Sequence, residues 1–565
     1  MADGPLIVQS DRTVLLEVAH PLASEARHAL AVFAELERAP EHIHTYRITR
    51  LGLWNARAAG HSAEEMLAVL ERYSKFAVPT SVAVDLTETV NRYGRLVIDR
   101  VDLSPDAALR LRSDDPSVLA EVANSKRVAP LLTGRIDAGS FQIAAWARGE
   151  LKQELVKLGW PAEDLAGYTP GTPHEFSLDP NRVAAGWDLR EYQQQAIDHF
   201  FAGGSGVVVL PCGAGKTLVG AGAMATAKTT TLILVTNIVA ARQWRDELLK
   251  RTTLTAEEIG EYSGQAKEIR PVTIATYQIL TAKRRGEYAH LALLDALDWG
   301  LIIYDEVHLL PAPVFKLTAE LQARRRLGLT ATLVREDGRE SDVFSLIGPK
   351  RFDAPWKEIE EQGFISPASC YEIRIDLPPS ERLGYAAAAD DERYRLAATA
   401  PAKLDIVRRL VARHAGERIL VIGQYLDQID EVAEQLGVPQ LTGATPVDER
   451  ERLFNEFRDG VTPVLVVSKV ANFSVDLPEA TVAIQISGSY GSRQEEAQRL
   501  GRLLRPKQSG LPARFYTLVA RDTVDQDFAQ NRQRFLAEQG YSYTILDAQT
   551  LEDALDSLLE VALPS

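Results

Sequence analysis

The sequence predicts an α/β chain with two tandem parallel-sheet layers, preceded by a mostly helical or α+β N-terminal region. Short runs of Val, Ile and Leu alternate with helical segments over residues 187–350, and the same alternation returns after residue 404. Strands that are apolar along their whole length are typical of parallel sheets covered by helices on both faces. A chain of 565 residues also predicts about three or four domains.

The N-terminal region is predicted in two parts. Residues 1–114 form an N-terminal extension, mostly helical, in which 62–76 has helical periodicity and 93–100 is a short strand. Residues 115–186 form a small α/β domain that ends in a linker rich in Pro, Gly and Asn.

The two layers are predicted over residues 187–352 and 353–548. The expected strands of the first layer are 205–210, 229–236, 271–277 and 299–306, and those of the second are 417–423, 462–468, 481–487 and 513–520. The bridge around 353–370 contains prolines and is expected to act as a hinge. Residues 549–565 are expected to form an acidic C-terminal tail that either docks a partner or packs as a terminal helix, the second being favoured.

Composition limits the class of protein. The two cysteines, Cys212 and Cys370, exclude a disulfide framework and a zinc cluster and fit a reducing cytosol. The net charge of −15 argues against coating DNA by bulk electrostatics, but not against a motor that grips a few phosphates. The first residues lack a basic segment followed by a long apolar run, so we expect no secretory signal. No apolar stretch approaches the ~20 residues that span a bilayer. We therefore expect a soluble, cytoplasmic protein without a membrane partner.

Residues 210–217 (LPCGAGKT) lie between a predicted strand and a predicted helix. Glycines let backbone N–H groups curl around a phosphate, and the helix N-terminus adds a favourable dipole. Lys216 is expected to reach the outer phosphates, and Thr217 is expected to place its hydroxyl on Mg²⁺. The strict pattern has Gly where this chain has Leu210, so a fortuitous turn is the alternative for this segment alone. The expected nucleotide contacts of the loop are Pro211, Cys212, Gly213, Ala214, Gly215, Lys216 and Thr217.

Two adjacent carboxylates, Asp305 and Glu306, follow the buried-strand pattern of 301–304. Beside a phosphate loop, such a pair has distinct functions. Asp305 is expected to hold Mg²⁺, and Glu306 to orient and deprotonate the attacking water. An isolated acidic pair after a strand is usually a solvated loop, but here both halves occur in order within one layer.

The second layer carries three arginines on one predicted helix face. Arg499, Arg502 and Arg505 are spaced by three residues, which places them near each other on a helix. An arginine delivered from outside stabilises the charge that builds up in phosphoryl transfer, so Arg502 and Arg505 are candidates for catalysis. The alternative is a salt-bridged surface helix, since two glutamates are nearby.

Together these motifs resemble helicase superfamily two of the DExH type, and within it the XPB family (the xeroderma pigmentosum group B helicase), particularly its bacterial members. The resemblance covers nearly the whole chain and implies two RecA-like domains. It includes Leu210 in the phosphate loop, the sequence DEVH at 305–308, the segment Arg335-Glu336-Asp337 that marks XPB proteins, and Gln498 where many RNA helicases have His. Residues 115–178 correspond in position to the family's damage-recognition domain, and its thumb insertion falls near 378–402.

The resemblance also implies roles for individual residues. Arg190 and Gln193 stand on the adenine side of the nucleotide, where Gln193 is the implied contact to the base, and Asp476 is the implied contact to the ribose. The segment Arg335–Asp337 is implicated in unwinding. The residues implied to contact DNA or to couple it to the nucleotide are Asn237, Trp244, Thr276, His308, Thr330, Thr332, Arg335, Glu336, Asp337, Thr442 and Gly443. Trp244 is also compatible with a place in the core.

The resemblance thus implies an ATP-dependent DNA helicase or translocase with 3′–5′ polarity, acting in repair on single-strand/duplex junctions and forks. ATP and Mg²⁺ are the implied cofactors, and in a bacterium the protein would be associated with the nucleoid. Two alternatives stay open: a duplex translocase or clamp that does not separate strands, and an RNA helicase. The sequence contains no evident metal-nuclease cluster, so any cutting would require a partner nuclease.

Overall fold

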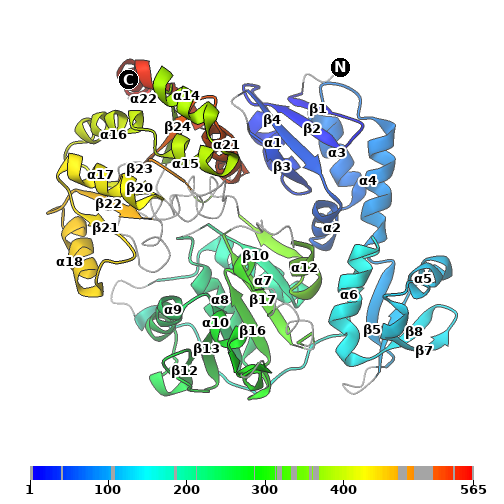
Figure 1. The fold of residues 1–565 in the computed structure, drawn as a ribbon. Helices are drawn as coiled ribbons and strands as arrows, with labels where there is room; N and C mark the ends of the chain where they lie inside the picture. The colour runs from blue at the N-terminus through cyan, green and yellow to red at the C-terminus, as the bar shows by residue number, and fades with distance from the viewer. Residues whose placement is uncertain are drawn as a thin grey trace.

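The computed structural model contains four folded units (Figure 1). In this view the first parallel-sheet layer lies at the bottom centre, the second layer at the upper left, the N-terminal unit at the upper right and a second small unit at the lower right. The structure describes residues 4–39, 42–102, 108–182, 187–211, 213–284, 287–311, 314, 321–322, 324–331, 340–354, 359, 368–468, 480–488, 513–538, 541 and 543–562. Within these ranges, no helix combines the length and the apolar character needed to cross a membrane.

The N-terminal unit is an antiparallel sheet covered by helices. Its strands, in the spatial order β1-β2-β4-β3, are β1 (Leu6–Val8), β2 (Thr13–Glu17), β3 (Ala34–Arg38) and β4 (Ile43–Ile48). Its helices are α1 (Ala23–Leu30), α2 (Arg50–Ala58), α3 (Ala63–Tyr73) and α4 (Thr80–Arg92). A capping box of Ser62 and Glu65 starts α3, because the two side chains satisfy backbone N–H groups that the first turn leaves free. The predicted mixture of helices and strands is confirmed.

His44 on β4 makes the stability of this unit depend on pH. Burial, together with the nearby charge of Arg27, lowers the pKa of His44 to about 4. The unfolded chain binds a proton at this residue near pH 6.5, so acidification below that value favours unfolding. We expect the unit to lose about 2 kcal/mol of stability from this residue between pH 7.5 and pH 5. Hydrogen exchange of the β2 and β4 amides would measure the loss, which should be absent in His44→Gln. An identical pH response in both proteins would contradict the prediction.

The second unit is a five-stranded sheet in the order β7-β8-β6-β5-β9. Its strands are β5 (Leu96–Arg100), β6 (Leu109–Arg112), β7 (Leu132–Asp137), β8 (Ser140–Ile143) and β9 (Ala162–Asp164), with helices α5 (Pro116–Ala123) and α6 (Arg148–Lys157). The predicted boundary at residue 114 is wrong, because β5 and β6 pair with β9 and β8 and so belong to this sheet. The boundary lies between α4 and β5.

The first layer is a seven-stranded parallel sheet in the order β12-β13-β11-β16-β17-β10-β18. Its strands are β10 (Gly206–Val209), β11 (Thr231–Val235), β12 (Ile259–Tyr262), β13 (Val272–Thr276), β16 (Leu301–Asp305), β17 (Arg325–Thr330) and β18 (Lys350–Asp353). The flanking helices include α7 (Glu191–Gly203), α8 (Lys216–Ala227), α9 (Ile238–Arg251), α10 (Tyr277–Thr281) and α12 (Glu340–Leu346). The central strands are buried along their whole length, as helices on both faces require.

The second layer repeats this architecture in the order β21-β22-β20-β23-β24-β19-β25, also fully parallel. Its strands are β19 (Ala368–Ile375), β20 (Ile419–Gly423), β21 (Gln440–Leu441), β22 (Val464–Ser468), β23 (Val482–Gln485), β24 (Ala513–Ala520) and β25 (Tyr543–Asp547). Its helices include α16 (Ala402–Arg413), α17 (Leu426–Leu436), α18 (Val447–Arg458), α21 (Val524–Glu538) and α22 (Leu551–Ala562). The predicted pair of parallel-sheet layers is confirmed.

Two predicted segments of the second layer take a defined form. The expected thumb region, 378–402, contains the two helices α14 (Pro379–Ala387) and α15 (Asp390–Ala398). The expected acidic tail is instead helix α22, whose Leu551 and Leu555 are buried in the core of the layer. Ion pairs from Arg413 to Glu552 and Asp556 fix its acidic face to α16. Residues 551–562 are therefore part of the second layer, as the packed terminal helix that was the alternative for this end requires, and the predicted end of the layer at residue 548 is too early.

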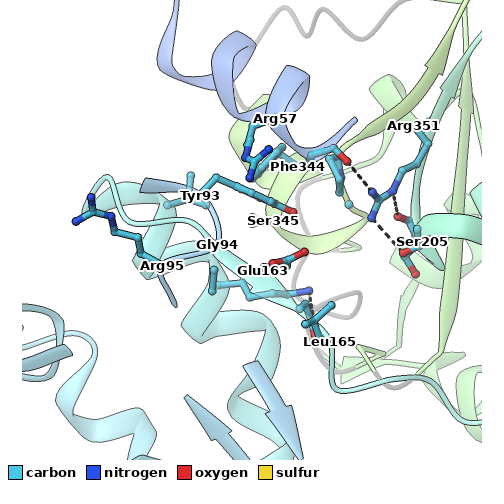
Figure 2. A pocket seen from close by; sticks show the side chains of 18 of the residues that line it. Arg57, Tyr93, Gly94, Arg95, Glu163, Leu165, Ser205, Phe344, Ser345 and Arg351 are labelled. Carbon is cyan, nitrogen blue, oxygen red and sulfur yellow. Dashed lines mark hydrogen bonds and ion pairs between the residues drawn. The ribbon is translucent and has the colours of Figure 1, made fainter. Parts of the chain in front are cut away.

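The first layer, the N-terminal unit and the second unit meet around a cavity of about 830 Å³ (Figure 2). Arg351 of β18 donates hydrogen bonds to the carbonyl oxygens of Ala58 in α2, Gly203 and Ser205. Phe344 of α12 lies against the ring of Tyr93, which follows α4. Ser205 precedes β10, so the cavity lies at the amino edge of the sheet. This is the edge opposite to the one where the predicted nucleotide residues lie.

Candidate active site

The carboxyl edge of the first sheet brings the two predicted halves of the site together. Strands β10, β16 and β17 run parallel, with Val209 opposite Thr330 and Asp305 opposite Leu329. The phosphate loop follows β10, and the acidic pair ends β16. Since parallel strands end at one edge, motifs about ninety residues apart in sequence become neighbours in space.

The phosphate loop has the backbone that a phosphate cradle needs. Gly213 and Gly215 have φ values of +84° and +80°, a left-handed conformation that glycine adopts at no steric cost. A Cβ atom on Gly215 would lie 2.4 Å from Nε2 of Gln193, so a larger residue does not fit there. Helix α8 begins directly after the loop, at Lys216, and directs its N-terminus towards it.

Two side chains of α7 form hydrogen bonds with the backbone of this loop. Nε2 of Gln193 and the hydroxyl of Tyr192 each donate a hydrogen bond of 2.8 Å to the carbonyl oxygen of Ala214. Oε1 of Gln193 accepts from the backbone N–H of Arg190, whose guanidinium donates to Tyr192. Gln193 is only 1% exposed. In this arrangement the Gln193 amide binds the backbone of the phosphate loop, and its predicted contact with the base stays a prediction.

The lysine of the loop and the predicted base form an ion pair. Nζ of Lys216 lies 2.7 Å from Oε1 of Glu306. Burial alone would raise the pKa of Glu306, but the charges of Lys216 and His308 outweigh it and the pKa is lowered. Glu306 has φ +49° and ψ 54°, a strained left-handed conformation that is uncommon for residues other than glycine. Among the described residues, no hydrogen bond reaches its buried Oε2.

The other carboxylate of the pair, Asp305, is held in a fixed orientation. Its Oδ1 accepts from the backbone N–H of Glu306 at 3.1 Å, and its Oδ2 accepts from Nε1 of Trp244 at 2.8 Å. Burial and the charge of Glu306 raise the pKa of Asp305. A divalent cation would favour the charged form, and the hydroxyl of Thr217 in the first turn of α8 is the predicted second oxygen ligand. The donor set is the carboxylate and hydroxyl oxygen that Mg²⁺ prefers.

His308 links the acidic pair to the neighbouring strand. Its Nδ1 lies 2.5 Å from the hydroxyl oxygen of Thr330 at the end of β17 and 3.5 Å from Oε2 of Glu306. Both His308 and Thr330 are buried. This contact joins the predicted base to the segment that starts at Thr330, while the coupling roles predicted for both residues stay predictions.

The predicted DNA contacts fall into two groups. Asn237 is half-buried and caps α9, its side-chain oxygen accepting from the backbone N–H of Ala240. Thr442 and Gly443 lie in the turn before α18, where Gly443 is exposed. Trp244 and Thr276 are 2% and 3% exposed, so both are buried in this structure, and their predicted contacts with DNA stay predictions. Trp244 lies in the core and contacts Asp305.

Several predicted residues lie outside the described part of the chain. They are Cys212, Thr332, Arg335, Glu336, Asp337, Asp476, Arg502 and Arg505. Their predicted roles stay predictions.

Two residues of the site were missed in the sequence. The hydroxyl of Tyr277 donates a hydrogen bond of 2.8 Å to the backbone carbonyl oxygen of Asp305. Gly220 lies in the interior of α8, and a Cβ atom there would lie 2.4 Å from the ring of Trp244. A glycine in the middle of a helix costs about 1 kcal/mol against alanine, and that cost was the available signal for close packing. No comparable signal marked Tyr277.

Comparisons with known proteins find matches along most of the chain. Residues 359–561 match the family model described as "ERCC3/RAD25/XPB C-terminal helicase", residues 6–137 match "Helicase conserved C-terminal domain", and residues 187–335 match "Type III restriction enzyme, res subunit". The chain is 65% identical over 552 residues to a DNA 3′-5′ helicase XPB of Kineococcus radiotolerans, covering 98% of both chains. It is 62% identical over 551 residues to a DNA 3′-5′ helicase XPB of Mycobacterium tuberculosis, covering 98% of this chain and 99% of the relative.

A eukaryotic relative matches almost as much of the chain. The general transcription and DNA repair factor IIH helicase/translocase subunit XPB of Antonospora locustae is 34% identical over 572 residues. The match covers 96% of this chain and 82% of the relative.

Proposed function

Because this chain belongs to the XPB family of DNA helicases, we propose that it couples ATP hydrolysis at the carboxyl edge of its first sheet to movement along DNA in the 3′–5′ direction and to strand separation. The observation that carries the proposal is the juxtaposition of Lys216, Asp305 and Glu306 beside a loop with two left-handed glycines. A phosphate cradle, a metal carboxylate and a base are the parts that nucleotide hydrolysis requires.

The ion pair suggests how the site responds to ATP. When ATP binds, Lys216 would leave Glu306 and pair with the phosphate oxygens. The electrostatic attraction of a cation to several phosphate charges is stronger than its attraction to one carboxylate. Glu306 would then be free to orient a water molecule and accept its proton. Mg²⁺ held by Thr217 and Asp305 would neutralise charge on the phosphates.

The second layer would complete the site. Arg502 and Arg505 follow β23 in the chain, and an arginine delivered to the transferred phosphate stabilises the charge that develops there. Hydrolysis would then require the two layers to close on each other. Repeated closing and opening around bound DNA would convert ATP turnover into stepping.

The DNA substrate and setting follow from the family. Single-strand/duplex junctions and forks are the proposed substrates, repair the proposed process, and the nucleoid the proposed location. Thr442 and Gly443 precede α18, where backbone N–H groups and hydroxyls can hold phosphates without reading sequence. Within the described ranges, no group of three or more His, Cys, Asp or Glu side chains could hold a metal ion, so we propose a separate nuclease for any cutting.

Two other functions use the same ATP site. A translocase that moves on duplex DNA without separating strands would need the same hydrolysis, and an RNA helicase would differ in its substrate. Gln498 and the segment Arg335–Asp337 favour DNA. Stimulation of the ATPase by DNA and by RNA distinguishes the nucleic acids.

A strand-displacement assay distinguishes unwinding from translocation. We expect release of the short strand from 3′-tailed and forked DNA, and little from 5′-tailed DNA, with ATP hydrolysis stimulated by each DNA that is bound. ATPase stimulation with no strand release on any substrate would favour the translocase. Displacement from 5′-tailed DNA alone would contradict the proposed polarity.

A further inference from the structure

The indole ring of Trp244 is enclosed beneath the phosphate-loop helix. Trp244 lies on α9, and its ring packs against Gly220 of α8, where a Cβ atom would approach to 2.4 Å. The ring is 2% exposed. With glycine at position 220, α8 leaves the space that this ring occupies.

The polar end of the same ring reaches the acidic pair. Nε1 of Trp244 donates a hydrogen bond of 2.8 Å to Oδ2 of Asp305. An indole N–H can only donate, and a hydrogen bond from a buried donor to a carboxylate is stronger than one between neutral groups. The bond therefore sets which way the carboxylate turns.

Asp305 is held at further points by its neighbours. Its Oδ1 accepts from the backbone N–H of Glu306, and its backbone carbonyl oxygen accepts from the hydroxyl of Tyr277. Each carboxylate oxygen has about two lone-pair sites, so one direction on each oxygen is used by protein and another remains for a ligand. Tyr277 of α10 therefore holds the backbone of Asp305, and Trp244 of α9 holds its side chain.

We propose that Trp244 is a positioning residue for the magnesium site: its indole N–H orients the Asp305 carboxylate that holds Mg²⁺ with ATP. The inference rests on the proposed function, in which Asp305 is the metal carboxylate. Partners that orient a metal ligand in this way typically change metal affinity or activity about ten- to a hundredfold when they are removed.

The test measures metal binding directly. Trp244→Phe removes the N–H and part of the ring, and replacement of Trp244 by benzothienylalanine removes the N–H but keeps the shape. The probe is Mn²⁺, whose free concentration is followed by electron paramagnetic resonance in the presence of a non-hydrolysable ATP analogue. We expect both variants to bind Mn²⁺ about tenfold more weakly, with the metal-free affinity for the analogue unchanged. The Mg²⁺ concentration for half-maximal ATPase activity should rise by the same factor.

Trp299 offers a matched control in the same layer. It is also fully buried, and its Nε1 donates a hydrogen bond of 3.0 Å to the backbone carbonyl oxygen of Leu293. Trp299→Phe therefore removes an equivalent ring and hydrogen bond away from the acidic pair. It should lower the melting temperature without changing Mn²⁺ affinity.

Asp305→Asn separates failure of the inference from failure of the proposed function. If Asp305→Asn abolishes Mn²⁺ binding but the benzothienylalanine protein binds Mn²⁺ as the wild type does, Trp244 has no positioning role. If Asp305→Asn itself binds Mn²⁺ normally, the proposed metal site is overturned, and the inference with it. A Trp244→Phe protein that does not fold leaves the benzothienylalanine protein, with its intact shape, to decide.

Discussion

Glu306→Gln is expected to abolish ATP turnover while leaving ATP binding nearly intact. The substitution keeps the size of the side chain and its contact with Lys216, because an amide oxygen can still accept from the lysine that now lies 2.7 Å from the carboxylate. An amide cannot accept the proton of the attacking water. Loss of a general base typically costs about 100- to 10,000-fold in rate, and we expect a decrease in that range.

The measurement pairs single-turnover phosphate release with the binding of a fluorescent ATP analogue. Glu247→Gln is a suitable control, since Glu247 lies on α9 of the same layer and pairs with Arg251 at 3.2 Å, away from the loop. Its turnover should match the wild type. Turnover of Glu306→Gln within tenfold of the wild type would remove Glu306 from the role of base.

Local patterns in the sequence predicted the parts of the site that one segment can specify. The phosphate loop is recognised from a strand, a glycine-rich turn and a helix that follow one another in the sequence. The acidic pair is recognised from two carboxylates directly after an apolar strand. Their approach to each other followed from the parallel sheet, because such strands end at one edge. In the structure Asp305 of β16 lies opposite Leu329 of the parallel strand β17, which agrees with this expectation.

Contacts between distant segments could not be predicted in the same way. Trp244 was compatible both with a DNA track and with the core, since an amphipathic helix does not specify what covers its apolar face. Likewise, the strand at Leu96–Arg100 was recognised, but its partner β9 follows about sixty residues later, and so the boundary at residue 114 was misplaced. The left-handed backbone of Glu306 has no sequence signal, because that conformation is imposed by tertiary contacts.

A buried charge network in the second layer carries the other large expected effect. Asp525 of α21 is fully buried, and its Oδ2 accepts hydrogen bonds from Nζ of Lys403 at 2.7 Å and from the backbone N–H of Ala520 at 3.1 Å. Nζ of Lys403 also donates to the backbone carbonyl oxygen of Ile486 at 3.0 Å. The hydroxyl of Tyr394 donates to the backbone carbonyl oxygen of Gly488. Ile486 and Gly488 lead into the segment with the predicted arginines, so this network anchors its start.

Asp525→Asn is expected to destabilise the second layer by about 3–5 kcal/mol, because it leaves the charge of Lys403 buried without a counterion. Burial already lowers the pKa of Lys403, opposed by the charge of Asp525, and loss of that charge would lower the pKa further. Chemical denaturation followed by a probe in the second layer would measure the change. DNA-stimulated ATPase activity should also fall at temperatures where the variant remains folded, since the anchor of the arginine segment is weakened.

The double variant Lys403→Met/Asp525→Asn distinguishes a charge effect from loss of packing. It removes the charges of Lys403 and Asp525 but keeps the buried guanidinium of Arg532, which lies 3.8 Å from Oδ1 of Asp525. Because one buried cation fewer then lacks the carboxylate, the double variant should be more stable than Asp525→Asn alone, a coupling that a double-mutant cycle detects. Asp427→Asn provides a surface control: Asp427 pairs with Arg395 at 2.6 Å, but both side chains are 59% exposed, and such pairs contribute at most about 1 kcal/mol. Equal losses of stability from Asp525→Asn and Asp427→Asn would show that the buried ion pair contributes no more to stability than an exposed pair. A double variant less stable than Asp525→Asn would point to packing in place of charge.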